Sequence, residues 1–116
     1  IFGDGLQVRD FNYIDDVVEA LLMVATAEAA DGQIYNLGSD DPINLMNLAR
    51  LLIEINGGGQ YELRPFPTDR KRIDIGDYYG DYRRIRSKLG WRPLVGLRDG
   101  MTRSIEYFRQ HLEHYI

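Results

Sequence analysis

The sequence predicts a small mixed α/β lobe of about four helices with short strands between them. Apolar residues recur at helical spacing in several segments, and short alternating or apolar runs between these segments indicate strands. Glycine and proline mark most of the boundaries. The predicted strands are too few for a complete sheet with helices on both faces, so the chain is expected to form a lobe of an α/β protein.

The first third of the chain is predicted to contain a turn, a strand and a helix. Gly3-Asp4-Gly5 suits a turn that follows a strand end at residues 1–2, and residues 11–14 alternate as a short strand does. Asp15 or Asp16 is predicted to cap a helix over residues 17–27. The apolar residues of this helix are expected to form one buried stripe of Val17, Val18, Leu21, Leu22, Val24 and Ala25.

The middle of the chain is predicted to continue as strand, helix and strand. Residues 33–38 indicate a strand, and Asn44 can cap the helix that follows. Gly57 to Gly59 should end that helix, because glycine is common at helix C-termini. Residues 61–66 indicate an edge strand bounded by prolines. The inward residues of this second helix are expected to be Leu45, Leu48, Leu51, Leu52 and Ile55.

Two helices are predicted in the last third, after a charged run over residues 68–72 and an irregular stretch. The first covers residues 82–89, is rich in arginine and is closed by Gly90. The second has Asp99 in its first turn, where the helix dipole favours a negative charge. Its apolar stripe steps at helical spacing through Leu97, Met101, Ile105, Phe108, Leu112 and Tyr115.

Composition excludes several classes of function. The formal net charge is −4, which argues against nucleic acid as a partner because phosphate neutralisation needs a basic surface. No apolar run is long enough to cross a membrane, and no segment has the pattern of a secretory signal. The chain has no cysteine, which suits a reducing compartment. We therefore expect a soluble, cytoplasmic protein that binds a small anion.

The residues of a redox or acid–base centre are missing from the sequence. A dinucleotide site needs a glycine-rich turn between a strand and a helix, whereas the only glycine cluster follows a helix. No tyrosine has a lysine four residues later, since Tyr82 has Arg86 at that place. His111 and His114 are better explained as a solvated helix end than as a metal site. We predict no catalytic, cofactor-binding or metal-binding residue in the chain.

One long segment and three shorter ones carry a resemblance to a known family. Residues 3–17, with the sequence GDGLQVRDFNYIDDV, resemble the GDGxQxRDFxYVDDV segment of the NAD-dependent epimerase/dehydratase family, which are extended short-chain dehydrogenases/reductases. In the family's order there follow residues 35–38 (YNLG), 70–81 (RKRIDIGDYYGD) and 89–93 (LGWRP). The resemblance covers essentially the whole chain.

The resemblance implies that residues 1–116 are the C-terminal, sugar-nucleotide-binding portion of a Rossmann-type enzyme. In this family the glycine loop and the Tyr-x-x-x-Lys pair lie upstream of the matching segments, in a cofactor domain that binds NAD. That domain is expected to be absent from this chain, which begins at Ile1 without an initiator methionine. The chain alone is therefore expected to bind no cofactor and to be inactive.

The resemblance also implies a set of substrate-binding residues. Arg9 matches an arginine that contacts the diphosphate and nucleoside end of the substrate, and Asp10 could orient it. Planar guanidinium groups bind phosphate oxygens with paired, charge-assisted hydrogen bonds. Asn36 matches an asparagine that contacts the nucleotide in related dehydratases, although asparagine at a strand end is also a common turn residue.

The second phosphate-binding cation is left open between neighbouring positions. The family commonly has an arginine three residues before an acid that helps to hold the ribose, and Asp74 matches that acid. The position three residues earlier is Lys71, which is a point charge and cannot bind in the bidentate manner of arginine. Either Lys71 takes the role, or the register shifts and Arg72 or Arg70 takes it.

The expected function is to anchor a UDP- or dTDP-sugar for an epimerase or dehydratase, most simply one similar to UDP-glucose 4-epimerase. The parent enzyme could alternatively be similar to a dTDP-glucose 4,6-dehydratase or to a UDP-glucuronate decarboxylase. A stand-alone binding or assembly module without catalysis is an alternative function. Either way, the apolar face that would pack on a cofactor domain is expected to be exposed, so we expect the chain to self-associate through it.

Overall fold

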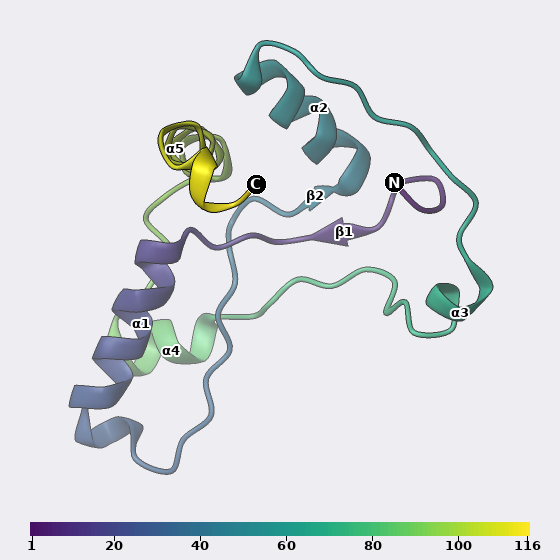
Figure 1. The fold of residues 1–116 in the computed structure, drawn as a ribbon. Helices are drawn as coiled ribbons and strands as arrows, with labels where there is room; N and C mark the ends of the chain where they lie inside the picture. Colours follow the sequence, from purple (N-terminus) through teal and green to yellow (C-terminus); the bar gives the residue numbers. More distant parts are fainter.

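The computed structural model describes all 116 residues, and a short β ribbon lies at its centre (Figure 1). Strand β1 (Val8–Arg9) pairs antiparallel with β2 (Ile43–Asn44), so that Val8 lies opposite Asn44 and Arg9 lies opposite Ile43. Arg9 also forms an isolated parallel bridge with Tyr78 on the other edge of β1. Residues near the N-terminus are thereby joined to two later segments.

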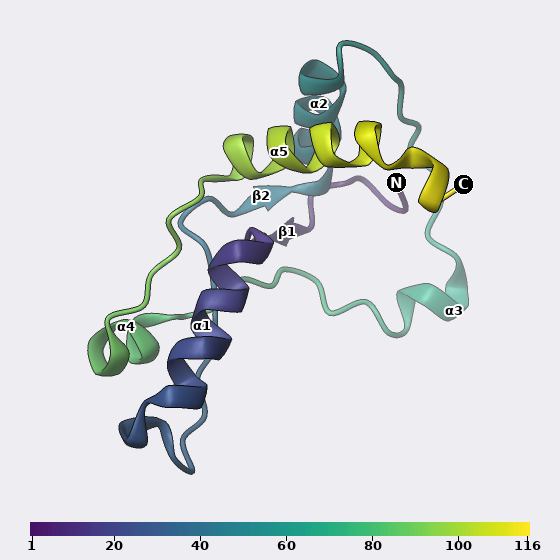
Figure 2. The ribbon, with the colours of Figure 1, turned by 60° about the vertical axis from the view of Figure 1, so that its left-hand side comes forward.

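Two pairs of helices lie on opposite sides of this ribbon (Figures 1 and 2). One pair contains α1 and α4, the other contains α2 and α5, and α3 stands apart on a long connection. None of the helices combines the length and apolar character needed to cross a membrane. The elements are α1 (Ile14–Thr26), α2 (Leu45–Asn56), α3 (Thr68–Lys71), α4 (Arg83–Leu89), α5 (Leu97–Gln110) and the 3₁₀ turns η1 (Glu28–Ala30) and η2 (Leu112–His114).

The core lies between α1 and α4. Ala20, Ile85 and Trp91 are buried together there, and the edge of the Tyr82 ring meets Trp91 with 5.7 Å between ring centroids. The indole Nε1 of Trp91 donates to the backbone carbonyl of Asp16 at 2.9 Å, which satisfies its only polar group. Trp91 is therefore a packing residue with one polar contact.

The predicted buried stripe of α1 is largely wrong, because four of its six residues are exposed and the other two are half-buried. Val24 packs against the core together with Ala20 and Met23, but Val18, Leu21 and Leu22 are 45–63% exposed. Only 8 of 116 residues are buried, and the radius of gyration is 16.8 Å, against roughly 13 Å for a compact chain of this length. The structure is therefore open, and the outer face of α1 has no partner within it.

Asp16 has a different role from the predicted helix cap. Tyr13 is the N-cap residue of α1 and makes no side-chain capping bond, whereas Asp16 lies in the first turn and is 4% exposed. Its Oδ2 accepts the N–H groups of Leu94 at 3.1 Å and Val95 at 3.0 Å. A buried carboxylate needs such donors, and these fix the connection before α5 to the start of α1.

The predicted strands over residues 11–14, 33–38 and 61–66 do not form as regular strands. Side chains donate to backbone carbonyls that a neighbouring strand would otherwise pair with. The Asn12 amide donates to the Gly38 carbonyl, and the Arg84 guanidinium donates to the Ile34 carbonyl. Residues 61–66 contribute a single parallel bridge between Arg64 and Phe2. The short helix α3 over part of the charged run was not predicted.

The boundaries that depend on local chemistry are confirmed. Asn44 caps α2 by accepting the Asn47 N–H at 2.8 Å, and Gly57 ends that helix in the left-handed conformation. Gly90 ends α4 in the same way, and Asp99 lies in the first turn of α5. The expected inward residues of α2 are half-buried, and α5 is the helix in contact with α2.

A close backbone crossing joins the chain at Gly38 and Gly80. A β-carbon on Gly38 would lie 2.9 Å from the carbonyl carbon of Gly80, and one on Gly80 would lie 3.0 Å from the carbonyl carbon of Leu37. The Asp10 Oδ2 accepts the N–H groups of Ser39 at 3.2 Å and Gly80 at 2.9 Å. Only glycine fits on both sides of this crossing.

Replacing Gly38 with alanine should therefore destabilise the fold. The new methyl group would overlap the Gly80 carbonyl, and the backbone would have to move apart. We expect the free energy of unfolding to fall by about 3 kcal/mol, measured by urea denaturation. Gly58→Ala is the matched control, since nothing lies within 4 Å of its β-carbon position. Equal urea midpoints for Gly38→Ala and Gly58→Ala would show that the crossing at Gly38 does not require glycine.

The Asp81–Arg83 pair should make stability depend on acid pH. Hydrogen bonds from the Arg83 guanidinium and backbone N–H hold the pKa of Asp81 at about 2, below its usual 3.8. The pKa is lowered on folding, so the contribution is complete above pH 3.8 and is lost as the pH falls towards 2. The difference between the urea midpoints of the wild type and Asp81→Asn should shrink over that interval. A constant difference would contradict this.

Candidate functional site

The candidate site lies at the edge of β1 that β2 does not cover. The backbone N–H of Tyr78 donates to the Val8 carbonyl at 3.0 Å, and the N–H of Val8 donates to the Asp77 Oδ1 at 2.8 Å. Residues 76–78 are thus attached alongside β1. This attachment brings the loop of residues 72–79 next to Arg9, although the two are far apart in sequence.

The Arg9 side chain is held by this loop. Its Nη1 donates to the Gly76 carbonyl and, at 2.7 Å, to the Val8 carbonyl. Its Nη2 lies 3.6 Å from the Asp74 Oδ1 in an ion pair whose side chains are 23% and 26% exposed. Nε makes no hydrogen bond within the chain. Arg9 is therefore fixed in direction, and 23% of its side chain remains exposed.

Two of the sequence-predicted site residues, Arg9 and Asp74, thus meet in space. The expectation that Asp10 orients Arg9 is wrong, because the Asp10 carboxylate is engaged by Ser39 and Gly80 at the backbone crossing. Asp74, with the Gly76 carbonyl, orients Arg9 instead. Asp10 acts on the site through the backbone, because it fixes the end of the loop at Gly80.

The other predicted residues are not drawn into this contact. Lys71 is the last residue of α3 and Arg72 its C-cap, and both are exposed and form no ion pair. Asn36 is exposed in the extended segment that precedes the Gly38 crossing, and its side chain makes no hydrogen bond. The choice among Arg70, Lys71 and Arg72 as the second cation therefore stays a prediction.

Gly76 and Asp77 also belong to this site and were not predicted from the sequence. Gly76 has φ 67°, a left-handed conformation that favours glycine, and its carbonyl accepts from Arg9. Asp77 lies in a run of polar and aromatic residues without periodicity, and so it resembled a solvated loop acid. The Gly76-Asp77 pair, a typical turn sequence, was the one signal that could have drawn attention to this position.

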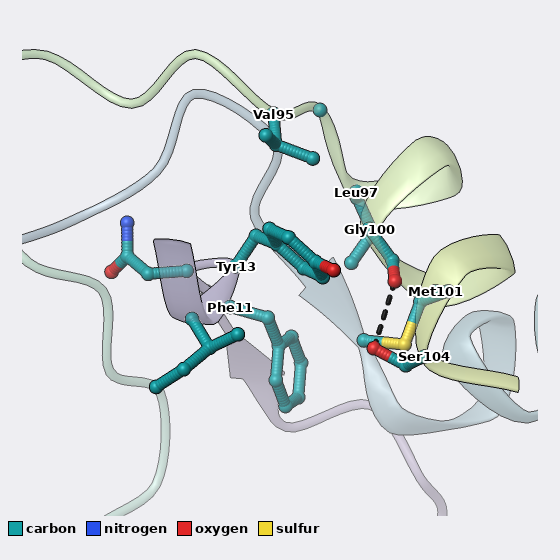
Figure 3. A pocket seen from close by; sticks show the side chains of 10 residues that line it. Phe11, Tyr13, Val95, Leu97, Gly100, Met101 and Ser104 are labelled. Atoms are coloured by element: carbon teal, nitrogen blue, oxygen red, sulfur yellow. Dashed lines mark hydrogen bonds between the residues drawn. The ribbon is translucent and has the colours of Figure 1, made fainter. Parts of the chain in front are cut away.

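A separate apolar cleft of roughly 200 Å³ lies between the start of α1 and α5 (Figure 3). Tyr13 packs over Gly100, where a β-carbon would lie 3.2 Å from its ring, and Arg103 stacks on the same ring at 5.5 Å. The cleft has no carboxylate, imidazole or amine in its lining. Its lining residues are Phe11, Asn12, Tyr13, Ile14, Val95, Gly96, Leu97, Gly100, Met101 and Ser104.

Comparison with known proteins places the chain within one group of enzymes. The profile of the family described as GDP-mannose 4,6 dehydratase matches residues 1–104. UDP-glucuronic acid decarboxylase 1 of Xenopus tropicalis is 32% identical over 98% of this chain and 26% of its own length. Human dTDP-D-glucose 4,6-dehydratase is 33% identical over 99% of this chain and 33% of its own length. The chain thus spans a quarter to a third of these curated relatives.

Solved structures share the fold of nearly the whole chain. UDP-glucose 4-epimerase from Thermotoga maritima, solved with UDP-glucose, is 36% identical with a TM-score of 0.85, and covers 97% of this chain and 35% of that one. A dTDP-glucose 4,6-dehydratase from Streptomyces venezuelae, solved with NAD, is 28% identical with a TM-score of 0.83, and covers 98% of this chain and 34% of that one. These neighbours confirm the predicted fold class.

Proposed function

The chain belongs to the NAD-dependent epimerase/dehydratase family, and we propose that its part in such an enzyme is to anchor the nucleoside diphosphate of a nucleotide sugar. Residues 1–116 would form the C-terminal substrate-binding portion. Family members differ in reaction, and the UDP-glucose 4-epimerase type is the simplest assignment for the parent enzyme. UDP- and dTDP-sugars are the ligands we propose.

The observation that carries this proposal is the meeting of Arg9 and Asp74. The guanidinium and the carboxylate lie 3.6 Å apart, and the side chains of Arg9 and Asp74 are 23% and 26% exposed, although Asp74 as a whole residue is exposed. Guanidinium groups bind phosphate oxygens, whereas a carboxylate accepts hydrogen bonds from sugar hydroxyls. Phosphate and ribose are adjacent groups in a nucleoside diphosphate, so neighbouring cationic and anionic groups match that part of the ligand.

Lys71 and Arg72 would supply further positive charge. They lie three and two residues before Asp74, are exposed, and are not neutralised by any ion pair. A diphosphate carries two negative charges on its bridge, and one arginine alone leaves much of that charge uncompensated.

Asn36, whose amide has no partner in the chain, would be a further contact to the nucleotide.

NAD does not fit the residues of this chain. A dinucleotide site requires a glycine turn that leads into a helix N-terminus, whereas Gly57, with φ 75°, ends α2. We propose that NAD binds in a cofactor domain outside residues 1–116. The chain would contribute binding energy far from the reacting carbon, which orients the sugar, and would carry out no catalysis by itself.

An alternative proposal is a binding or assembly module without catalysis. The exposed face of α1 favours it, because Val18, Leu21 and Leu22 form an apolar surface without a partner in the chain. A module of this kind would associate with a second copy through that face, whereas in an intact enzyme the face would be covered by the cofactor domain.

Replacing Leu22 with glutamate should test whether the chain self-associates through this face. The new charge would lie in the centre of the α1 face, where burial against a second copy would be costly. Sedimentation velocity of the wild-type chain should show association that Leu22→Glu abolishes. The control Gln110→Glu adds the same charge at the exposed end of α5 and should still associate. A wild-type chain that is monomeric at high concentration would contradict self-association.

The anchor itself is tested by titrating the chain with UDP, dTDP and GDP and following the backbone amides by heteronuclear NMR. The largest changes in amide chemical shift should occur in β1 and in residues 71–78. Arg9→Gln should weaken UDP or dTDP binding about tenfold or more, because a charged hydrogen-bonding group is lost. The loop should be retained, because Asp77 and Tyr78 hold it on β1 through the backbone of Val8 and not through the side chain of residue 9.

Arg50→Gln is the matched control, since it removes the same charge from the exposed side of α2. Its affinity should equal that of the wild type. The proposal is wrong if none of the three nucleotides perturbs the β1 edge, or if Arg9→Gln and Arg50→Gln bind equally well.

A further inference from the structure

Asp77 takes the place of a strand partner for β1. The backbone N–H of Val8 points to the side of β1 where no strand follows, and the Asp77 Oδ1 accepts it at 2.8 Å. The carbonyl of Val8 accepts the Tyr78 N–H at 3.0 Å. Both backbone groups of Val8 are therefore satisfied by two consecutive residues of the loop.

This pair of contacts fixes the position of Gly76, the residue before Asp77. The Gly76 carbonyl accepts from the Arg9 Nη1, which also donates to the Val8 carbonyl at 2.7 Å. Two acceptors on one nitrogen determine the plane of the guanidinium. Asp74, two residues before Gly76, then meets the Arg9 Nη2 at 3.6 Å.

We infer that Asp77 is a positioning residue for the diphosphate anchor. By holding residues 76–78 on β1, it sets the direction in which the Arg9 guanidinium faces a nucleoside diphosphate. It does not touch the ligand. This inference rests on the proposed function, because it assigns Asp77 a role only if Arg9 binds the nucleotide.

The chemistry predicts that the oxygen acceptor of Asp77 matters and its charge does not. Asparagine retains a side-chain oxygen at the same place and can accept the Val8 N–H, whereas alanine cannot. Both substitutions remove the same negative charge from the vicinity of Arg9. Their difference therefore isolates the hydrogen bond from the electrostatic effect.

The test compares UDP binding by the wild type, Asp77→Ala, Asp77→Asn and the control Asp31→Ala in the full chain. Asp31 is an exposed acid in the turn after η1, and its loss removes the same charge elsewhere. Binding is followed by NMR titration, and the order of the Arg9 side chain is read from its Nε–H signal.

Asp77→Ala should bind UDP about tenfold more weakly than the wild type, with a broadened Arg9 Nε–H signal and an unchanged unfolding midpoint. Asp77→Asn and Asp31→Ala should bind within about twofold of the wild type. The inference is overturned if Asp77→Ala binds as tightly as the wild type, or if Asp77→Asn is as weak as Asp77→Ala.

The Arg9→Gln titration decides the proposed function separately. If Arg9→Gln keeps the wild-type affinity, the diphosphate anchor itself is wrong and the role of Asp77 in ligand binding is overturned with it. If Arg9→Gln loses binding while Asp77→Ala keeps it, the anchor stands and only the positioning role of Asp77 is overturned.

Discussion

The arrangement of the site depends on the hydrogen bonds that the carboxylate of Asp10 accepts. This carboxylate accepts backbone N–H groups from Ser39 and Gly80, and so holds together two segments that cross without space for a side chain. The loop that meets Arg9 begins after α3 and ends at this crossing. If the crossing opened, residues 74–78 would lose one fixed end, and the alignment with β1 would depend on the contacts of Asp77 and Tyr78 alone.

The long motif at residues 3–17 is explained largely by the fold. Asp4 accepts the Leu6 N–H in the first turn, Asp10 holds the crossing, and Asp16 accepts two N–H groups ahead of α5. Each of these acids satisfies backbone donors that no strand or helix covers. Arg9 differs from them, since its side chain holds no free backbone N–H group and its Nε makes no hydrogen bond within the chain. A motif can thus be mainly structural and still contain one residue suited to a ligand.

Local signals in the sequence were sufficient for the start of α2 and for the ends of α2 and α4, and insufficient for the start of α1, for α3 and for the strands. Asn44, Gly57 and Gly90 act through their own backbone and nearest turns, so their roles could be predicted without knowledge of the fold. The segment of residues 33–38 depends on distant partners, which proved to be the side chains of Asn12 and Arg84. Arg9 and Asp74 were predicted from a family resemblance, whereas Asp77 lies in the same matching segment as Asp74 but had no role assigned to it.

The burial of Trp91 has a spectroscopic consequence. It is the only tryptophan, and it lies between α1 and α4 with its indole bonded to the Asp16 carbonyl. Its fluorescence therefore reports on that half of the molecule, while α2 and α5 on the other side of the ribbon contribute to the circular dichroism without affecting the indole (Figure 2). The two signals therefore distinguish loosening of one helix pair from unfolding of the whole chain.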